Sequence, residues 1–458
     1  MMKAVILGGS WAGLMAARVL ADHAEEITIL TPEQPGRSPG DPPHRMQLHA
    51  LLSAGHSMLE RLFPGITTDI TVAGGRIGSG PTVRFYVDGV LRVPVPNDRN
   101  TMVGATRALI EDLVLERVSA LPNVGFLRSR ATGLVIRNGR VSAVRANITS
   151  PESKNDTLLK LETDLVVDAM GRASRLGHWL EEQGWEPPPL QRLRIELGYA
   201  TALFRRGPEL PELVIAHAAP GPTSRYQPTL CEPAALAAVE GNQWNVVTSG
   251  YAGHRPGRSA KRFLDRMKKS APPFRDIAES CDMVGEVTPF SFTESQRRLY
   301  HSMARFPGGL IPIGDTVASV NPIYGQGLTL ALLQSEALSH YLASAPSLKE
   351  PARSYLLAVT RIVDTAWNLS TTADLAQPHV TGPYPRGYSL TRWIGDRVLL
   401  ASVIDPTLCA TFMDVLHMRQ PPNALVHPKL LTRTARVLAA ERRRLRQSSP
   451  RGPRTTTP

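Results

Sequence analysis

The chain has 458 residues, a length that predicts two or three domains rather than one small core. With 42% apolar and 20% charged residues it has the composition of a soluble globular protein, and no apolar run approaches the roughly 18 residues of a membrane span. The three cysteines lie far apart without metal-ligand spacing, which argues against a disulfide framework and a zinc site and favours a cytoplasmic location.

The net charge of +12 is concentrated near the C-terminus. Eight arginines but only one acid, Glu441, follow residue 430, so this segment carries most of the excess charge. No nucleic-acid-binding motif accompanies the arginines. We therefore expect a solubilising, disordered tail at 448–458, and neither nucleic acid nor a membrane as a partner.

The first predicted element is a short apolar strand at residues 3–8, which leads through a glycine-rich turn into a helix. Gly8, Ser10 and Gly13 occupy the three glycine positions of a G-x-G-x-x-G dinucleotide-binding turn. Gly8 permits the tight turn, the small Ser10 lets the backbone approach a pyrophosphate, and Gly13 lets the helix pack closely on the strand. The sequence therefore predicts a dinucleotide site at the start of the chain.

The second predicted strand covers residues 25–30. In dinucleotide-binding domains a carboxylate usually follows this strand and holds the ribose hydroxyls. Thr31 takes that place here, and Glu33 stands two residues further on. Glu33 is thus the candidate ribose ligand. The alternative that it plays no part in binding is equally open.

A second glycine-rich turn lies within residues 309–330, between a predicted strand and a predicted helix. Asp315 stands at the end of the strand, where a carboxylate suits a polyol hydroxyl, although capping a helix is the structural alternative. The turn at 321–327 opens the helix, whose amino end attracts negative charge. Between the two turns, residues 164–180 form another strand that ends in small residues.

At these motifs the chain resembles the FAD-dependent aromatic hydroxylase superfamily, the group A type of flavin monooxygenase. Within it, the likeness is greatest to polyether-type olefin epoxidases, such as those of monensin and lasalocid biosynthesis. The resemblance covers nearly the whole chain and agrees in sequence order. It rests on residues 8–13, 43–49, 107, 164–176, 297–300, 314–315, 321–327 and 367–378.

The resemblance implies a role for each matching residue. Arg107 would approach the flavin and the pyrophosphate, and Asp315 would bind the ribityl chain. The remaining implied flavin-binding residues belong to one turn, whose amides would lie near the pyrimidine edge of the ring: Pro322, Gly325, Gln326 and Gly327. For Arg297 and Arg298, a salt-bridged sheet edge and a contact with flavin or substrate stay open as alternatives.

The predicted fold class is α/β, with a discontinuous Rossmann-type FAD-binding domain at 1–74, 101–182 and 296–345. Inserted segments at 75–100 and 183–295 alternate in hydrophobicity and predict a mainly antiparallel sheet, the substrate domain. Residues 346–447 are expected to be helical.

A substrate pocket is expected between the flavin and this sheet. Candidates for its wall are aromatic, with ordinary core packing as the alternative for each: Tyr199, Phe204, Trp244, Tyr251 and Trp367. His44 and His49 are candidate acid–base groups or flavin contacts, and no catalytic residue is assigned. No metal is expected.

The resemblance implies a monooxygenase that transfers one oxygen atom from O2, through a C4a-hydroperoxyflavin, to an apolar polyketide, terpenoid or aromatic intermediate of secondary metabolism such as antibiotic biosynthesis. Olefin epoxidation is favoured because no proton relay is evident. NADPH or NADH would supply electrons directly or through a flavin reductase. The alternatives are an aromatic hydroxylase and a flavin-linked reductase or dehydrogenase of isoprenoid-type double bonds. A halogenase is disfavoured because the W-x-W-x-I-P signature is absent.

Overall fold

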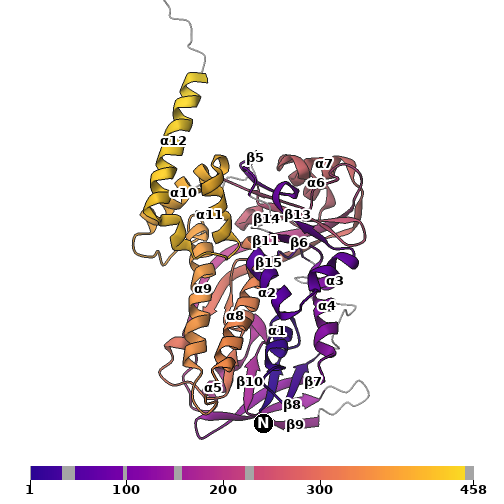
Figure 1. The fold of residues 1–458 in the computed structure, drawn as a ribbon, viewed down its shortest axis with the longest axis vertical. Coiled ribbons are helices and arrows are strands. Elements are labelled where there is room, and N and C mark those ends of the chain that lie inside the picture. The colour runs from indigo at the N-terminus through magenta and orange to yellow at the C-terminus, as the bar shows by residue number, and fades with distance from the viewer. Residues whose placement is uncertain (1, 33–46, 96–100, 149–156, 222–231, 449–458) are drawn as a thin grey trace, which may run out of the picture.

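The computed structural model describes residues 2–32, 47–95, 101–148, 157–221 and 232–448. Two β-sheets dominate this part of the chain, one at each end of the molecular body, with long helices running between them (Figure 1). Glu33, His44 and the tail at 449–458 lie outside the described residues, so the predictions made for them stay predictions.

The first sheet has seven strands in the order β16-β10-β1-β2-β7-β8-β9. The first five pair in parallel, and β8 and β9 extend the sheet as antiparallel strands. The parallel strands are apolar on both faces, as expected where helices cover a sheet on both sides. In sheet order the strands are Leu310–Pro312, Leu165–Asp168, Lys3–Leu7, Glu26–Thr31, Val124–Arg137, Arg140–Ile148 and Thr157–Glu162.

Seven helices belong with this sheet in the described part of the chain. Helix α1 follows β1 directly and packs against α8, which in turn packs against α9 and α2 (Figure 1). Alanines and leucines on the facing sides allow these helices to pack closely. The helices are α1 (Trp11–Leu20), α2 (Ser53–Leu62), α3 (Ile66–Val72), α4 (Arg107–Ser119), α5 (Leu176–Glu181), α8 (Gly327–Ala343) and α9 (Arg353–Asp374).

The second sheet has eight strands in the order β17-β15-β11-β14-β13-β12-β4-β5. All neighbours are antiparallel except β12 and β4. Helices α6 (Ala260–Lys269) and α7 (Pro272–Ser280) lie at this end of the molecule (Figure 1). In sheet order the strands are Ala318–Ser319, Met283–Arg298, Leu190–Arg205, Gln243–Tyr251, Ala234–Val239, Ile215–Ala219, Val83–Val87 and Val90–Leu91.

Three further helices complete the chain: α10 (Tyr388–Ile404), α11 (Pro406–Leu416) and α12 (Pro428–Ser448). Helix α12 projects away from the body (Figure 1). A two-stranded sheet joins β3 (Arg76–Gly78) to β6 (Met102–Gly104). The 3-10 helices are Gly80–Thr82, Gly171–Ala173, Ala252–His254, Tyr300–Ser302, Gly314–Thr316, Pro322–Tyr324 and Pro422–Val426.

This arrangement confirms the predicted fold class: an α/β domain built from separate segments, an inserted and mainly antiparallel sheet, and a helical C-terminal region. The expected domain boundary at residue 296 falls inside β15, which is one continuous strand. Strand β17, from the segment assigned to the first domain, pairs with β15 of the second sheet. The second sheet therefore includes a strand from the segment assigned to the first domain. Among the described helices, none combines the length and apolar character of a membrane span.

Candidate functional site

A cavity of about 640 Å³ lies between the two sheets. One side consists of the turns that follow the carboxyl ends of β1, β10 and β16, three adjacent parallel strands. The other side consists of residues on β4 and on β11 to β15 of the second sheet. Ligands of open α/β sheets bind at the carboxyl ends of the strands, so the fold itself marks this cavity as the candidate site.

The first glycine turn brings helix α1 close to strand β1. Gly8 has a φ of +109°, and a Cβ atom there would lie 2.7 Å from the Ala169 carbonyl oxygen. At Gly13 a Cβ atom would overlap the Gly8 carbonyl oxygen. Ser10 lines the cavity and is the N-cap residue of α1, but its side chain makes no capping hydrogen bond. The amino end of α1 therefore opens onto the cavity with backbone N–H groups available to an anion.

The second glycine turn brings helix α8 to the same cavity. Pro322, Gly325 and Gly327 line it, and Gly325 has a φ of +66°. A Cβ atom at Gly327 would meet nothing within 4 Å, so the space in front of this helix end is open. The Gln326 side chain turns inward, is fully buried, and has no hydrogen-bond partner among the described residues. Of this residue, only the backbone remains a candidate ligand.

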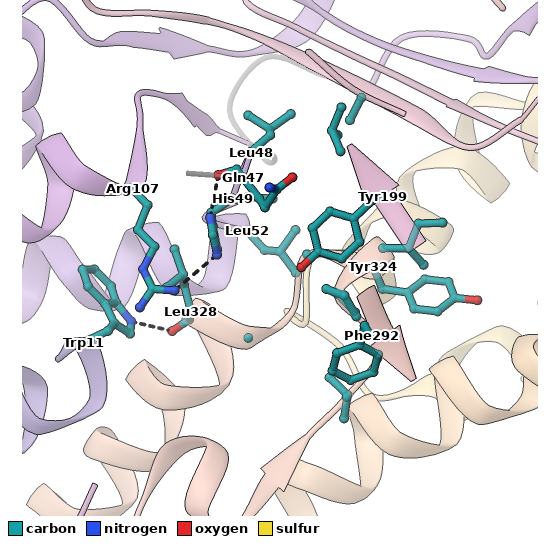
Figure 2. Close-up of a pocket in the computed structure, with 18 of the residues that line it drawn as sticks. Trp11, Gln47, Leu48, His49, Leu52, Arg107, Tyr199, Phe292, Tyr324 and Leu328 are labelled. Atoms are coloured by element: carbon teal, nitrogen blue, oxygen red, sulfur yellow. Dashed lines mark hydrogen bonds between the residues drawn. The ribbon is translucent and has the colours of Figure 1, made fainter. Parts of the chain in front are cut away.

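The amino ends of α1 and α8 are tied together. The Trp11 indole N–H donates a hydrogen bond of 3.0 Å to the Leu328 carbonyl (Figure 2). Both residues line the cavity. Two helix amino ends, held side by side by a buried hydrogen bond, thus face the same space.

Arg107 stands at the start of α4, where Thr106 caps the helix through the Leu109 N–H. Its guanidinium pairs with Glu111 at 2.7 Å, lies 3.4 Å from the Ser10 hydroxyl, and donates to His49 Nε2 at 3.2 Å (Figure 2). The structure therefore brings the predicted residues Ser10 and Arg107 together at the cavity wall.

His49 lines the cavity but both of its ring nitrogens have partners in the chain. Arg107 donates to Nε2, which leaves the ring proton on Nδ1, where it is donated to the Gln47 carbonyl at 2.8 Å. With both nitrogens engaged, the ring orients Arg107 and has no free position for proton transfer.

Asp315 lies on the turn after β16 and lines the cavity. Its side chain is exposed, and desolvation by the surrounding protein raises the pKa of the carboxyl group. The positive charge of Arg107 and a hydrogen bond from Ser319 partly oppose that rise. The carboxylate can accept hydrogen bonds from hydroxyl groups of a ligand in the cavity.

The aromatic residues expected at the pocket wall separate into two groups. Tyr199 on β11 lines the cavity (Figure 2), whereas Phe204 on the same strand is fully buried elsewhere. Trp244 is also absent from the wall: it is fully buried in a core with Phe204 and donates to Glu209 at 2.6 Å. Alternation along the strands explains the error, because odd-numbered positions of β11 and β14 face the cavity and these two are even.

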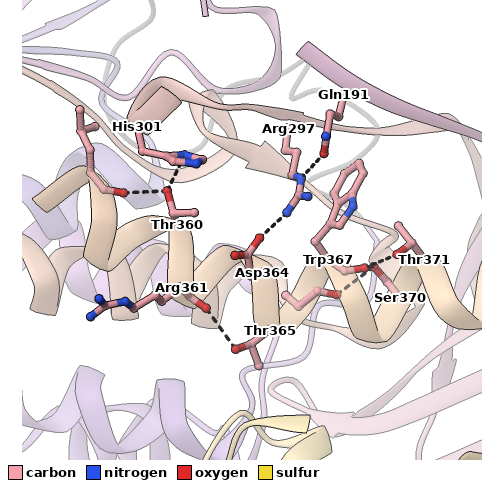
Figure 3. Close-up of polar contacts among 12 residues, drawn as sticks. Gln191, Arg297, His301, Thr360, Arg361, Asp364, Thr365, Trp367, Ser370 and Thr371 are labelled. Carbon is pink, nitrogen blue, oxygen red and sulfur yellow. Dashed lines mark hydrogen bonds and ion pairs between the residues drawn. The ribbon is translucent and has the colours of Figure 1, made fainter. Parts of the chain in front are cut away.

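For Trp367 the structure likewise shows packing rather than a place at the cavity wall. It lies on α9 outside the cavity wall, with the Arg297 guanidinium 4.7 Å above its ring (Figure 3). Arg297 in turn pairs with Asp364 at 2.5 Å and donates to Gln191 at 2.7 Å. These contacts join the second sheet to α9. Of the two alternatives for Arg297, the structure therefore supports a structural salt bridge rather than a contact with flavin or substrate.

Arg298 is likewise bound within the chain. Its guanidinium donates to the backbone carbonyls of Thr316 and Arg172, at 2.9 and 3.0 Å. Both carbonyls belong to turns that border the cavity. Arg298 therefore supports the site from outside. Tyr251 is in a similar position, since its hydroxyl bonds to Asp374 rather than facing the cavity.

Several lining residues escaped the sequence analysis: Phe85, His217, Phe290, Phe292 and His417. Four of them lie on strands whose alternate residues face the cavity, a signal that becomes readable only when the sheet register is known. Gln47 was missed for a different reason. It anchors the loop before α2 by donating to the Thr288 carbonyl and accepting from the Thr201 hydroxyl, contacts that span two distant segments.

Several solved structures with similar folds are described as flavin-dependent proteins or flavoproteins. The structure of a flavoprotein/dehydrogenase from Cytophaga hutchinsonii matches 96% of this chain with a TM-score of 0.66 at 14% identity, and covers 100% of that chain. The flavin-dependent brominase Bmp2 matches 98% of this chain and 100% of its own, with a TM-score of 0.64 at 14% identity.

A third structure is p-nitrophenol 4-monooxygenase PnpA from Pseudomonas putida DLL-E4, with a TM-score of 0.59 at 15% identity over 96% of this chain and 98% of that chain. The chain has the fold of flavin-dependent oxidoreductases. In sequence, it is 28% identical to Protein Rv3254 of Mycobacterium tuberculosis over 97% of this chain and 96% of that protein. No family model matches the chain.

Proposed function

We propose that the chain binds FAD in the cavity between the sheets and uses it as a monooxygenase on an apolar small molecule. The observation that carries the proposal is the convergence of two glycine-rich turns, at the amino ends of α1 and α8, on one cavity that also contains the Asp315 carboxyl group. Flavin-dependent monooxygenases among the structures of similar fold support it.

The residues present fit the pyrophosphate, the ribityl chain and the ring edge of FAD. The open amino end of α1 at Ser10 suits the pyrophosphate, and Asp315 suits the ribityl hydroxyls. Arg107 would lie near the pyrophosphate, as the family resemblance implies. At α8, the open space in front of Gly327 would admit the edge of the flavin ring, where the backbone N–H groups favour negative charge. Glu33 remains our proposal for the ribose.

Bound FAD would supply the redox chemistry that activates O2, and the protein would position the substrate and exclude water. The wall opposite the two turns is apolar for the most part, with Ile215, Val247, Phe290 and Phe292 among its residues. Such a wall would hold an apolar substrate by burial of its surface.

Epoxidation of an olefin is the reaction that we favour. Hydroxylation of a phenol benefits from a base that removes the phenolic proton. Apart from Asp315, which we assign to the ribityl chain, the described cavity wall offers none suited to that task. Burial lowers the pKa of His217 to about 4 and that of His417 to about 3, and it raises the pKa of Tyr199. An olefin requires no such deprotonation. NADPH or NADH would deliver electrons directly or through a separate flavin reductase.

Incubation with labelled dioxygen tests the reaction. The FAD-loaded enzyme, reduced by NADPH or by an added flavin reductase, is offered a panel of olefinic and phenolic polyketides and terpenoids. We expect mass spectrometry to find one labelled oxygen atom in an olefinic product. Label in a phenolic product would instead support an aromatic hydroxylase. A product altered by two hydrogens without oxygen would contradict the proposal in favour of a reductase or dehydrogenase.

A further inference from the structure

His417 stands at the carboxyl end of α11, lines the cavity and is 1% exposed. Its Nδ1 accepts a hydrogen bond of 3.2 Å from the Ser53 N–H, and its carbonyl accepts another from the Ala54 N–H. The residue thus caps the amino end of α2. Because Nδ1 is an acceptor, the proton of the neutral ring is on Nε2. Nε2 is buried and has no hydrogen-bond partner among the described residues.

His217 on β12 lines the same end of the cavity. Its ring centroid lies 5.8 Å from that of Phe85, and the His417 ring packs edge-on against the same phenyl ring at 6.2 Å. Two imidazoles therefore flank one phenyl ring. In the described part of the chain, no hydrogen bond engages the His217 ring.

Both imidazoles are neutral near pH 7. Burial lowers the pKa of His217 to about 4, and the nearby positive charge of Arg92 contributes. Burial and the charge of Arg419 lower the pKa of His417 to about 3. A neutral imidazole retains one N–H donor. The cavity end therefore presents donors that carry no charge.

Arg92 adds a positive potential behind this end of the cavity. The side chain is buried, lies over the Phe412 ring at 4.4 Å, and contacts the Met413 sulfur. Within the described residues, the group that acts electrostatically on Arg92 is the Cys409 thiol rather than a carboxylate. The potential disfavours a cationic ligand group and favours an atom with partial negative charge, such as a carbonyl oxygen.

We propose that His217 and His417 form a hydrogen-bond-donating end of the cavity that recognises a carbonyl oxygen on an otherwise apolar substrate. A carbonyl oxygen is an acceptor for an imidazole N–H. A buried N–H without a partner is costly, and the oxygen would satisfy it. The inference rests on the proposed function, because it describes the substrate of that same cavity, and it narrows the substrate class to hydrophobic ketones and related carbonyl compounds.

A matched pair of ligands tests the inference by calorimetry on the FAD-loaded protein. One ligand is a naphthyl methyl ketone and the other its isopropenyl isostere, in which a methylene group replaces the carbonyl oxygen. One net hydrogen bond corresponds to a roughly 2- to 10-fold preference, so we expect the ketone to bind more tightly by at least this factor. Equal affinity for the two ligands in the wild-type protein would overturn the inference.

Leucine and glutamine substitutions of the two histidines test whether their N–H groups are the hydrogen-bond donors. His217→Leu should bring the ratio of ketone affinity to isostere affinity toward one, while the affinity for the isostere is retained. His417→Leu should have the same effect. His217→Gln and His417→Gln each retain an N–H donor and should keep most of the preference. His340→Leu, which changes an exposed histidine on α8, should leave the ratio unaltered.

Two readouts keep the outcomes separable. Loss of the Ser53 partner could unfold His417→Leu, so His217→Leu and His417→Gln, checked by circular dichroism, decide the matter. A ketone preference that persists in His217→Leu and in a folded His417→Leu variant would refute the assignment. The flavin content of every sample is measured separately by absorbance. Absent flavin would contradict the proposed function, whereas an absent ketone preference in flavin-loaded protein would contradict only this inference.

Discussion

At the scale of single residues, the cavity has two chemically different ends. Around Asp315 and Arg107 it is lined by charged side chains and by open helix ends, which suit a phosphorylated and polyhydroxylated ligand. Around His217 and His417 it is lined by neutral donors among apolar side chains. A cofactor at the first end and a hydrophobic substrate at the second would place the reacting groups between them.

Replacement of Asp315 tests the first end. Asp315→Ala should weaken FAD binding about 10- to 100-fold, because a charged hydrogen bond to the ribityl chain is worth roughly 1.5–3 kcal/mol. Fluorescence titration measures the change. Asp364→Ala, which removes a carboxylate that pairs with Arg297 outside the cavity, serves as the control and should bind FAD like the parent. Similar affinities in the two variants would contradict the assignment of Asp315.

The structure shows why three glycines of the predicted turns are needed, whereas their role in cofactor binding stays a prediction. Gly8, Gly13 and Gly325 are required by close approaches or positive φ angles, and such constraints leave a mark in the sequence. For Trp244 and Trp367 core packing stayed open as the alternative to the cavity wall, because hydrophobicity alone does not distinguish the two. For Trp244 on β14 the parity of the strand position resolves that ambiguity, and parity depends on which face of the sheet is covered by helices.

At the scale of elements, the strand–turn–helix units β1–α1 and β16–α8 were predictable because each combines an apolar run with a glycine turn. The link between α8 and α9 could not be predicted from the sequence. Asp374, at the end of α9, is fully buried and accepts a hydrogen bond of 2.7 Å from Asn321, the first residue of the second glycine turn. Tyr251 joins the same group at 3.3 Å. Only the folded chain brings these three segments together.

The Asp374 contact predicts a pH dependence of stability. Burial raises the pKa of Asp374 to about 7 from an ordinary value of 3.8, although hydrogen bonds from Asn321 and Tyr251 oppose the rise. The native state then binds a proton more tightly than the unfolded state does. Ionisation of this group therefore lowers the free energy of unfolding as pH rises from about 4 to about 7, by at most about 1.4 kcal/mol per pH unit. Above this range the loss is constant.

Asp374→Asn removes the ionisation and keeps the acceptor oxygen. Thermal melts of parent and variant between pH 4 and pH 8 should therefore diverge, with the variant gaining relative stability as pH rises. Asp364→Asn, at a partly buried ion pair on the same helix, controls for general charge effects. Parallel melting curves for parent and Asp374→Asn across this range would show that Asp374 titrates normally.

At the scale of the whole molecule, the cavity exists only because distant parts of the chain meet. The turns of the first sheet form one side, the second sheet forms the other, and Leu416 and His417 from the C-terminal helices close part of the wall. The sequence predicted two domains with a pocket between them. It placed one residue of the C-terminal helical region, Trp367, at the wall, but not Leu416 and His417, because amphipathic periodicity identifies a buried face without indicating what that face covers.

Titration of the cofactor-free protein with FAD tests the central claim most directly. Both glycine turns face one cavity, so the dinucleotide should bind saturably, with one FAD per chain and a shifted flavin absorbance spectrum. FMN lacks the adenylate half and the pyrophosphate for which the amino end of α1 is suited, and it should bind much more weakly. Failure of FAD to bind, or equal affinity for FAD and FMN, would contradict the assignment of this cavity as a dinucleotide-binding flavin site.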